Sequence, residues 1–211
     1  MRPDPDGWWS FSEPILSGTL VYTSHQSSEW EPDFQPPTQI NKWFDGTKWI
    51  TETVVPPKGL WVQRYYLDVI DYAYELEPAV RKPVSIPGSL IGLAGDGALL
   101  FTRGYTHSEA NWWDYRETIY ATSYDGVEAR LVTQMELPTQ WPHPSISFDG
   151  HVLLGQPGSA KTDTAPEVKP SLELWALSAE GKFARQAALQ RDTAADSFEL
   201  LNDILAVRSS Q

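Results

Sequence analysis

The sequence contains no cysteine and has few basic residues. The lack of cysteine excludes disulfide bonds, thiolate metal sites and cysteine nucleophiles, although it does not indicate a cellular compartment. The sequence has 16 Lys and Arg residues and 28 Asp and Glu residues, which gives a formal net charge of -12. No Lys or Arg cluster provides the positive patch that phosphate backbones or anionic lipids require. We therefore expect no nucleic-acid partner.

Long hydrophobic runs are missing as well. No stretch approaches the roughly 18 uncharged apolar residues that a membrane-spanning helix needs. Residues 1–6 contain two prolines and two aspartates, so they do not form the apolar region of a signal peptide. The sequence predicts neither a membrane span nor a signal peptide.

Aromatic residues, proline and glycine are abundant. The 211 residues include 10 Trp, 9 Tyr, 17 Pro and 14 Gly, and 41% are hydrophobic, which is enough apolar material for a folded core. Prolines recur along the whole chain and leave little room for long helices, whereas aromatic and β-branched residues favour strands. The composition predicts an all-β fold.

A short repeat organises the chain. Runs that start with a turn residue and continue with apolar residues begin at residues 18, 97, 150 and 203, and the last three are spaced by 53 residues. A short strand precedes the later runs, and a predicted hairpin follows each of the first three. Two of these hairpins turn at Asp125-Gly126 and Glu180-Gly181, which are residue types of tight turns. Four strands per unit of about 50 residues, in meander order, are typical of a β-propeller blade.

This pattern predicts three and a half four-stranded antiparallel blades. Their approximate bounds are 8–88, 89–143, 144–195 and, for the partial blade, 196–211. The long first unit is explained by a hairpin over residues 38–57, inserted between its second and third strands around Asp45-Gly46. In an alternative register this hairpin ends one blade and another blade starts at Gly59.

Three and a half blades do not close a ring of the usual four to eight. Either the chain is part of a longer protein, or a second chain completes the ring. The expected partners are therefore additional blades from the same or another chain, or a different protein partner, with a glycan as a further possibility.

Several segments resemble a family of bacterial secreted proteins with a C-terminal β-propeller domain distantly related to WD repeats. The resemblance covers about residues 60–211 and is carried by segments 67–72, 84–88, 96–101 and 119–126. It implies a propeller fold and an extracytoplasmic location, although the chain has no recognisable signal peptide. Members of this family generally have no assigned catalytic residues, so the resemblance implies no site.

The long predicted loops, residues 24–64, 104–117 and 155–170, should emerge on one face of the propeller. Exposed aromatic side chains are common at binding sites, so the sequence predicts a binding face there. The alternative is that these rings pack the loops onto the blades. The predicted binding residues are Trp30, Phe34, Tyr105, His107, Trp112, Trp113 and Trp141, and the charged or titratable neighbours are His25, Glu29, Glu31, Glu109 and Asp114.

Catalysis has little support in the sequence. The available acid/base pairs are His107 with Glu109 or Asp114, and Glu29 with Asp114. No nucleophile elbow, phosphate-binding loop or His-x-x-x-His motif accompanies them. We expect no metal and no cofactor. The predicted function is a non-enzymatic binding or scaffolding module, and the alternative is a carbohydrate-binding or carbohydrate-active propeller that uses loop tryptophans and carboxylates.

Overall fold

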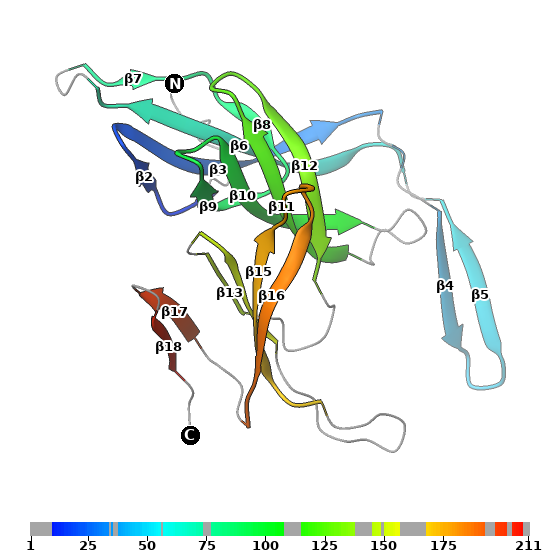
Figure 1. Cartoon of the computed structure of the whole chain (residues 1–211). Coiled ribbons are helices and arrows are strands. Elements are labelled where there is room, and N and C mark those ends of the chain that lie inside the picture. Colours follow the sequence, from blue (N-terminus) through cyan, green and yellow to red (C-terminus); the bar gives the residue numbers. More distant parts are fainter. Residues whose placement is uncertain are drawn as a thin grey trace.

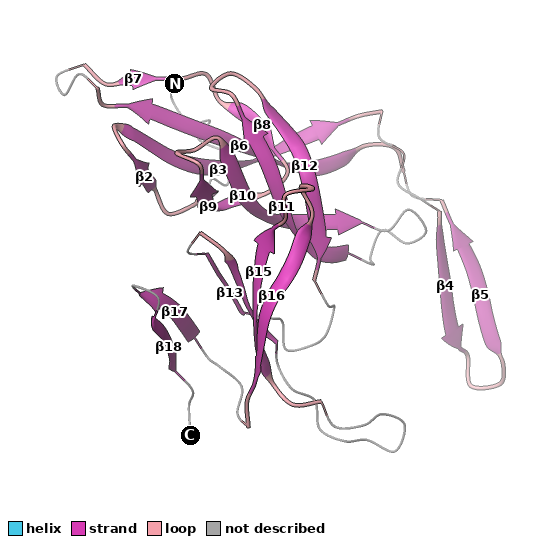
Figure 2. Cartoon of the chain, in the orientation of Figure 1, coloured by secondary structure: helices cyan, strands magenta, loops and turns pink. Residues whose placement is uncertain are grey.

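A computed structural model gives the fold of the chain (Figures 1 and 2). It describes residues 10–33, 35, 38–55, 57–73, 77–107, 115–137, 145–148, 150–156, 168–192, 197–201 and 204–208. Within these residues every regular element is a β-strand, and every strand pair is antiparallel. The predicted all-β class is confirmed.

The first sheet has four positions, although it contains six strands. Its two long central strands pair with each other, and each outer position is divided between two short strands on the same edge. The strands are β1 (Ser10–Phe11), β2 (Ile15–Ser17), β3 (Leu20–Glu31), β6 (Leu60–Asp71), β7 (Ala79–Val80) and β8 (Val84–Ile86).

The second sheet follows the chain order directly, as β9-β10-β11-β12. Its strands are β9 (Ser89–Ala94), β10 (Leu99–His107), β11 (Tyr115–Tyr124) and β12 (Ala129–Glu136). The predicted turn at Asp125-Gly126 joins β11 to β12: Asp125 Oδ1 accepts the N–H groups of Val127 and Glu128 at 2.9 and 2.8 Å, and Gly126 has a φ of 97°. These backbone hydrogen bonds lower the pKa of Asp125.

The third sheet repeats this order as β13-β14-β15-β16, and a separate pair follows it. The strands are β13 (Ser145–Phe148), β14 (Val152–Gln156), β15 (Ser171–Leu177), β16 (Phe183–Gln190), β17 (Ser197–Leu201) and β18 (Ile204–Arg208). The predicted turn at Glu180-Gly181 lies between β15 and β16, where Leu177 pairs with Phe183.

One hairpin belongs to none of these sheets. Strands β4 (Gln39–Phe44) and β5 (Trp49–Val54) fall within residues 38–57 and pair only with each other. They lie in the sequence between β3 and β6, which are themselves paired. Figure 1 shows the hairpin at the right, apart from the sheets.

Successive sheets contact each other through outer strands, and the second and third sheets do so at both outer positions. The first strands β9, β13 and β17 are neighbours in series, and so are the last strands β8, β12 and β16. The sheets therefore stack in the order of the chain. Among the described residues they do not close into a ring.

Two hydrophobic cores lie on opposite faces of the second sheet. Side chains alternate between the faces of a strand, so Leu100 enters the core shared with the first sheet, whereas the adjacent Phe101 enters the core shared with the third sheet. Leu100 is fully buried, as are Val152 and Leu154 of the third sheet. The continuous apolar runs of β10 and β14 thus belong to strands that are covered on both faces.

Candidate binding site

An arm extends from the first sheet. Strands β3 and β6 pair over their full length of 12 residues each, but the outer strands flank them only as far as Gln26 and Tyr65. Beyond these residues β3 and β6 continue as a two-stranded ribbon, and the β4–β5 hairpin follows in sequence. We define the arm as residues 27–31, 39–54 and 60–64.

The tip of the arm is a tight turn over residues 45–48. Asp45 Oδ1 accepts the N–H groups of Thr47 and Lys48 at 2.8 and 2.9 Å, and the Asp45 N–H donates to the Lys48 carbonyl at 3.1 Å. Gly46 has a φ of 97°, which glycine adopts without steric cost. The backbone hydrogen bonds from Lys48 and Thr47 lower the pKa of Asp45.

Large aromatic side chains on the arm are exposed. Within a two-stranded sheet there is no second layer to bury them. The exposed fractions are 50% for Trp30, 43% for Trp43, 53% for Phe44, 72% for Trp49 and 63% for Trp61.

These rings contact each other in two pairs. Trp30 and Trp61 are directly opposite on β3 and β6, with ring centroids 5.7 Å apart, and Phe44 and Trp49 are opposite on the hairpin at 5.6 Å. A Cβ atom at Gly59 would lie only 2.3 Å from Cζ2 of Trp30, so the Trp30 ring packs directly on the Gly59 backbone. Cross-strand aromatic pairs of this kind stabilise a ribbon that has no core.

Polar side chains also join the two strands of the ribbon. Gln26 donates to Gln63 at 2.5 Å, and Gln63 donates to Ser28 at 2.8 Å. On the other face, the Tyr66 hydroxyl donates to Glu29 Oε1 at 2.5 Å, which raises the pKa of Tyr66.

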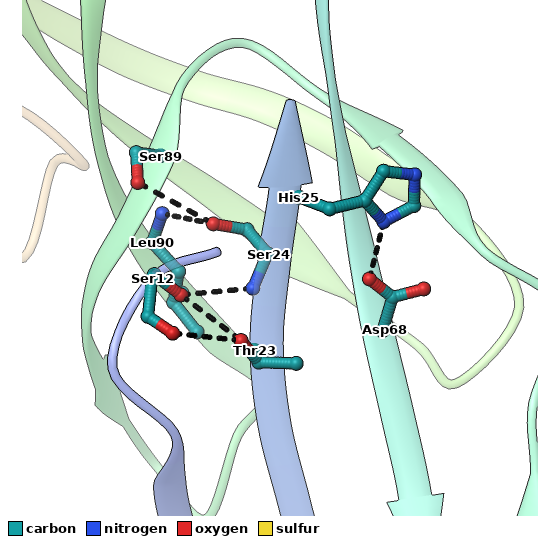
Figure 3. Close-up of polar contacts among 7 residues, drawn as sticks. All are labelled: Ser12, Thr23, Ser24, His25, Asp68, Ser89 and Leu90. Atoms are coloured by element: carbon teal, nitrogen blue, oxygen red, sulfur yellow. Dashed lines mark hydrogen bonds and ion pairs between the residues drawn. The ribbon is translucent and has the colours of Figure 1, made fainter. Parts of the chain in front are cut away.

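The base of the arm is connected to the second sheet. The buried Ser24 Oγ accepts the N–H of Leu90 at 2.8 Å, and the Ser24 N–H donates to Ser12 Oγ at 2.8 Å (Figure 3). The buried Ser24 hydroxyl thus has a partner, as buried polar groups require.

On the opposite face of β3, His25 forms a close pair with a carboxylate. Its Nδ1 lies 2.5 Å from Asp68 Oδ2 (Figure 3), and its ring stacks on Tyr66 with a centroid distance of 5.3 Å. The Phe11 ring is 6.0 Å away. A His–carboxylate pair is a part of many acid/base sites, but this imidazole lies between two aromatic rings, which suits a pair that fixes the fold.

The structure corrects the predicted positions of two site residues. Trp30 and Tyr105 were expected in long loops, but Trp30 lies in β3 and Tyr105 in β10. The strands continue through residues 24–31, 60–64 and 104–107 because cross-strand pairing persists to the ends of the ribbons. His25, Glu29 and Glu31 are likewise strand residues.

The other predicted site residues are placed only in part. His107 is the last residue of β10, paired with Tyr115. The remaining six lie outside the described residues: Phe34, Glu109, Trp112, Trp113, Asp114 and Trp141.

Four aromatic residues of the arm were not among the predicted site residues: Trp43, Phe44, Trp49 and Trp61. For Trp43, Phe44 and Trp49, the sequence contained a signal that could have predicted their exposure. A hairpin that is inserted between two paired strands has no sheet to pack against, so its aromatic side chains remain exposed. Trp61 was placed in a loop, and its position opposite Trp30 depends on a strand pairing that the sequence does not determine.

The described residues offer no group of three or more His, Asp or Glu side chains arranged to hold a metal ion. In the same part of the chain, no helix is long and apolar enough to cross a membrane. No protein-family model and no curated protein matches the chain. The resemblance to bacterial propeller proteins therefore stays a prediction.

Proposed function

We propose that this protein is a non-enzymatic binding or scaffolding module, in which consecutive β-propeller blades carry an arm that binds a protein partner. The stacking of the sheets supports the propeller. The first strands β9, β13 and β17 are neighbours in series, and so are the last strands β8, β12 and β16. Propeller blades arranged around an axis contact each other in this way.

The exposed tryptophans carry the proposal. Five tryptophans lie among the described residues, namely Trp30, Trp43, Trp49, Trp61 and Trp175, and the first four are exposed on the arm. Tryptophan is highly buried on average, and exposed apolar patches mark interaction sites. Tryptophan is also enriched among the residues that contribute most to binding energy.

The hairpin indicates the shape of the partner. Cross-strand pairing places Phe44 and Trp49 on one face and Trp43 and Ile50 on the other. A flat surface would cover only one of these faces. An apolar groove on a partner protein would enclose both, and we propose such a groove as the occupant of this site.

Charge contributes little to this contact. The arm carries three cationic and four acidic side chains, whereas the whole chain has a net charge of -12. The cationic residues are Lys42, Lys48 and Arg64, and the acidic residues are Glu29, Glu31, Asp45 and Glu52. Binding should depend on apolar burial and change little with ionic strength.

Affinity capture with matched variants tests this function. The arm variant replaces Trp43, Phe44 and Trp49 by Thr, which preserves strand propensity. The control variant replaces Leu131, Val132 and Leu189 by Thr, since these side chains are also exposed but lie on other sheets. Proteins captured by the wild type are identified, purified and titrated against all three chains at low and high salt.

A partner that binds the wild type and the control variant, but not the arm variant, supports the proposal. Equal binding to all three chains would refute it. Steep salt dependence would indicate a charged surface instead. Of the tryptophans that the carbohydrate alternative uses, Trp30 lies in β3, whereas Trp112, Trp113 and Trp141 lie outside the described residues.

A further inference from the structure

A cavity of about 420 Å³ lies between the first and second sheets, and its lining includes Gln63 and Arg64 of the arm but no tryptophan. Strands β6 and β8 form one side, and β10, β11 and β12 form the other. This volume is within the range of about 300–1,000 Å³ that is usual for small-molecule sites. The lining includes the polar or aromatic residues Gln63, Tyr65, Ser85, Tyr105 and Thr122.

Thr122 is the most informative lining residue. It is 1% exposed, and its Oγ1 has no hydrogen-bond partner. Thr122 pairs with Leu100, so its side chain is on the face of the second sheet that turns toward the first sheet. Buried hydroxyl groups nearly always have partners, and Thr122 lines the cavity, so a ligand that reaches its Oγ1 would supply the missing hydrogen bond.

The other lining groups define the chemistry of the ligand. Tyr65 and Tyr105 provide aromatic rings, and burial and the nearby Tyr105 raise the pKa of Tyr65, which keeps its hydroxyl protonated. Gln63 and Ser85 are neutral. Arg64 is the only charged side chain among the lining residues, and it pairs with Glu31.

We propose that this cavity binds a neutral, polyhydroxylated molecule of monosaccharide size. Hydroxyl groups both donate and accept hydrogen bonds, as the amide and hydroxyl groups of the lining require. The C–H faces of a sugar ring suit the tyrosine rings. A charged ligand would find no free counter-charge among the lining residues.

The chain offers a matched pair of variants for the test. Thr122→Val removes the hydroxyl at the cavity. Thr102→Val removes a second buried hydroxyl that also has no partner and lies on the same sheet face, but Thr102 does not line the cavity. Thr122→Ser keeps the hydroxyl as a rescue variant.

The probes are glucose, galactose, mannose and N-acetylglucosamine, with glucuronate and glucosamine as charged comparators. Saturation-transfer NMR detects binding, and calorimetric titration measures it. We expect at least one neutral sugar to bind, with affinity reduced about fivefold or more by Thr122→Val and unchanged by Thr102→Val and Thr122→Ser.

Three results would overturn the proposal: no saturable binding of any neutral sugar, stronger binding of the charged comparators, or an equal effect of both valine variants. Melting temperatures of all variants are measured in parallel. If Thr122→Val does not fold, Tyr105→Phe replaces it, and unchanged affinity in that variant would count against the site.

Discussion

Adjacent side chains of β10 serve different parts of the molecule. Leu100 packs toward the first sheet, Phe101 toward the third, and Thr102 again toward the first. The run from Leu99 to Phe101 contains only apolar residues, and Leu100 and Phe101 are both buried. At this scale the sequence is sufficient to predict burial on both faces, because a strand without alternating polar residues has no face that suits solvent.

Leu100→Ala should lower the free energy of unfolding by about 2–5 kcal/mol, since it leaves a cavity in a fully packed core. The control is Leu131→Ala, whose side chain is 56% exposed and should cost less than about 0.5 kcal/mol. Urea unfolding measures both. Similar losses for the two variants would contradict the assignment of Leu100 to the core.

Thr102→Val should leave stability unchanged or raise it by about 1 kcal/mol, because it removes a buried hydroxyl that has no partner. Thr118→Val should instead destabilise the protein by about 1 kcal/mol, since the equally buried Thr118 hydroxyl donates to the Arg116 carbonyl at 3.3 Å. Thermal and urea unfolding of the pair distinguish these outcomes. A larger loss for Thr102→Val than for Thr118→Val would reverse the interpretation.

Stability should fall as the pH rises above about 10. Burial raises the pKa of Tyr65 and Tyr120 in the folded protein, whereas the tyrosines of the unfolded chain ionise near the ordinary value of 10.0. Above that pH the unfolded state therefore binds fewer protons, and its formation becomes easier. Urea unfolding at pH 8 and pH 11 measures the change, and Tyr65→Phe should reduce it. A free energy of unfolding that rises with pH in this interval would be inconsistent with buried, protonated tyrosines.

At the scale of elements, turns were predicted better than strand ends. Asp45-Gly46, Asp125-Gly126 and Glu180-Gly181 each turn a hairpin, because the glycine of each pair adopts the positive φ that the turn needs. The length of β3 and β6 depends instead on pairing between residues that are far apart in sequence. Residues 24–31 and 60–64 were therefore taken for loops, and the arm was not recognised.

The β4–β5 hairpin should be dispensable for folding. It pairs only within itself, so replacing residues 38–57 by a short Gly-Ser linker should change the melting temperature by less than about 2 °C. Differential scanning calorimetry and circular dichroism provide the measurement. A large drop would mean that the hairpin packs against the sheets and is not a free arm.

At the scale of the whole molecule, the second sheet is the centre of the stack. It shares one core with the first sheet and another with the third. The repeat at residues 97, 150 and 203 predicted the strands, since each repeat reuses the same local pattern. The angle between sheets, and with it closure into a ring, depends on packing that no local pattern specifies.

Amide hydrogen exchange should follow this arrangement. The N–H groups of β10 and β11 are expected to exchange only through global unfolding, because their sheet is covered on both faces, while those of β4 and β5 exchange through local opening. Exchange measured by mass spectrometry or NMR gives the order. Faster exchange in β10 than in the hairpin would be incompatible with a central second sheet.

The alternation of Leu100 and Phe101 between two cores also affects which insertions and deletions the gene can accept. Removing one codon within β10 would exchange the faces of every later residue in the strand, and the leucine and phenylalanine side chains would enter the wrong cores. One codon lost from the turn at residues 45–48 would disturb only the tip of the arm. Length variation among natural versions of this chain should therefore accumulate in the arm, while β10 varies by substitution alone.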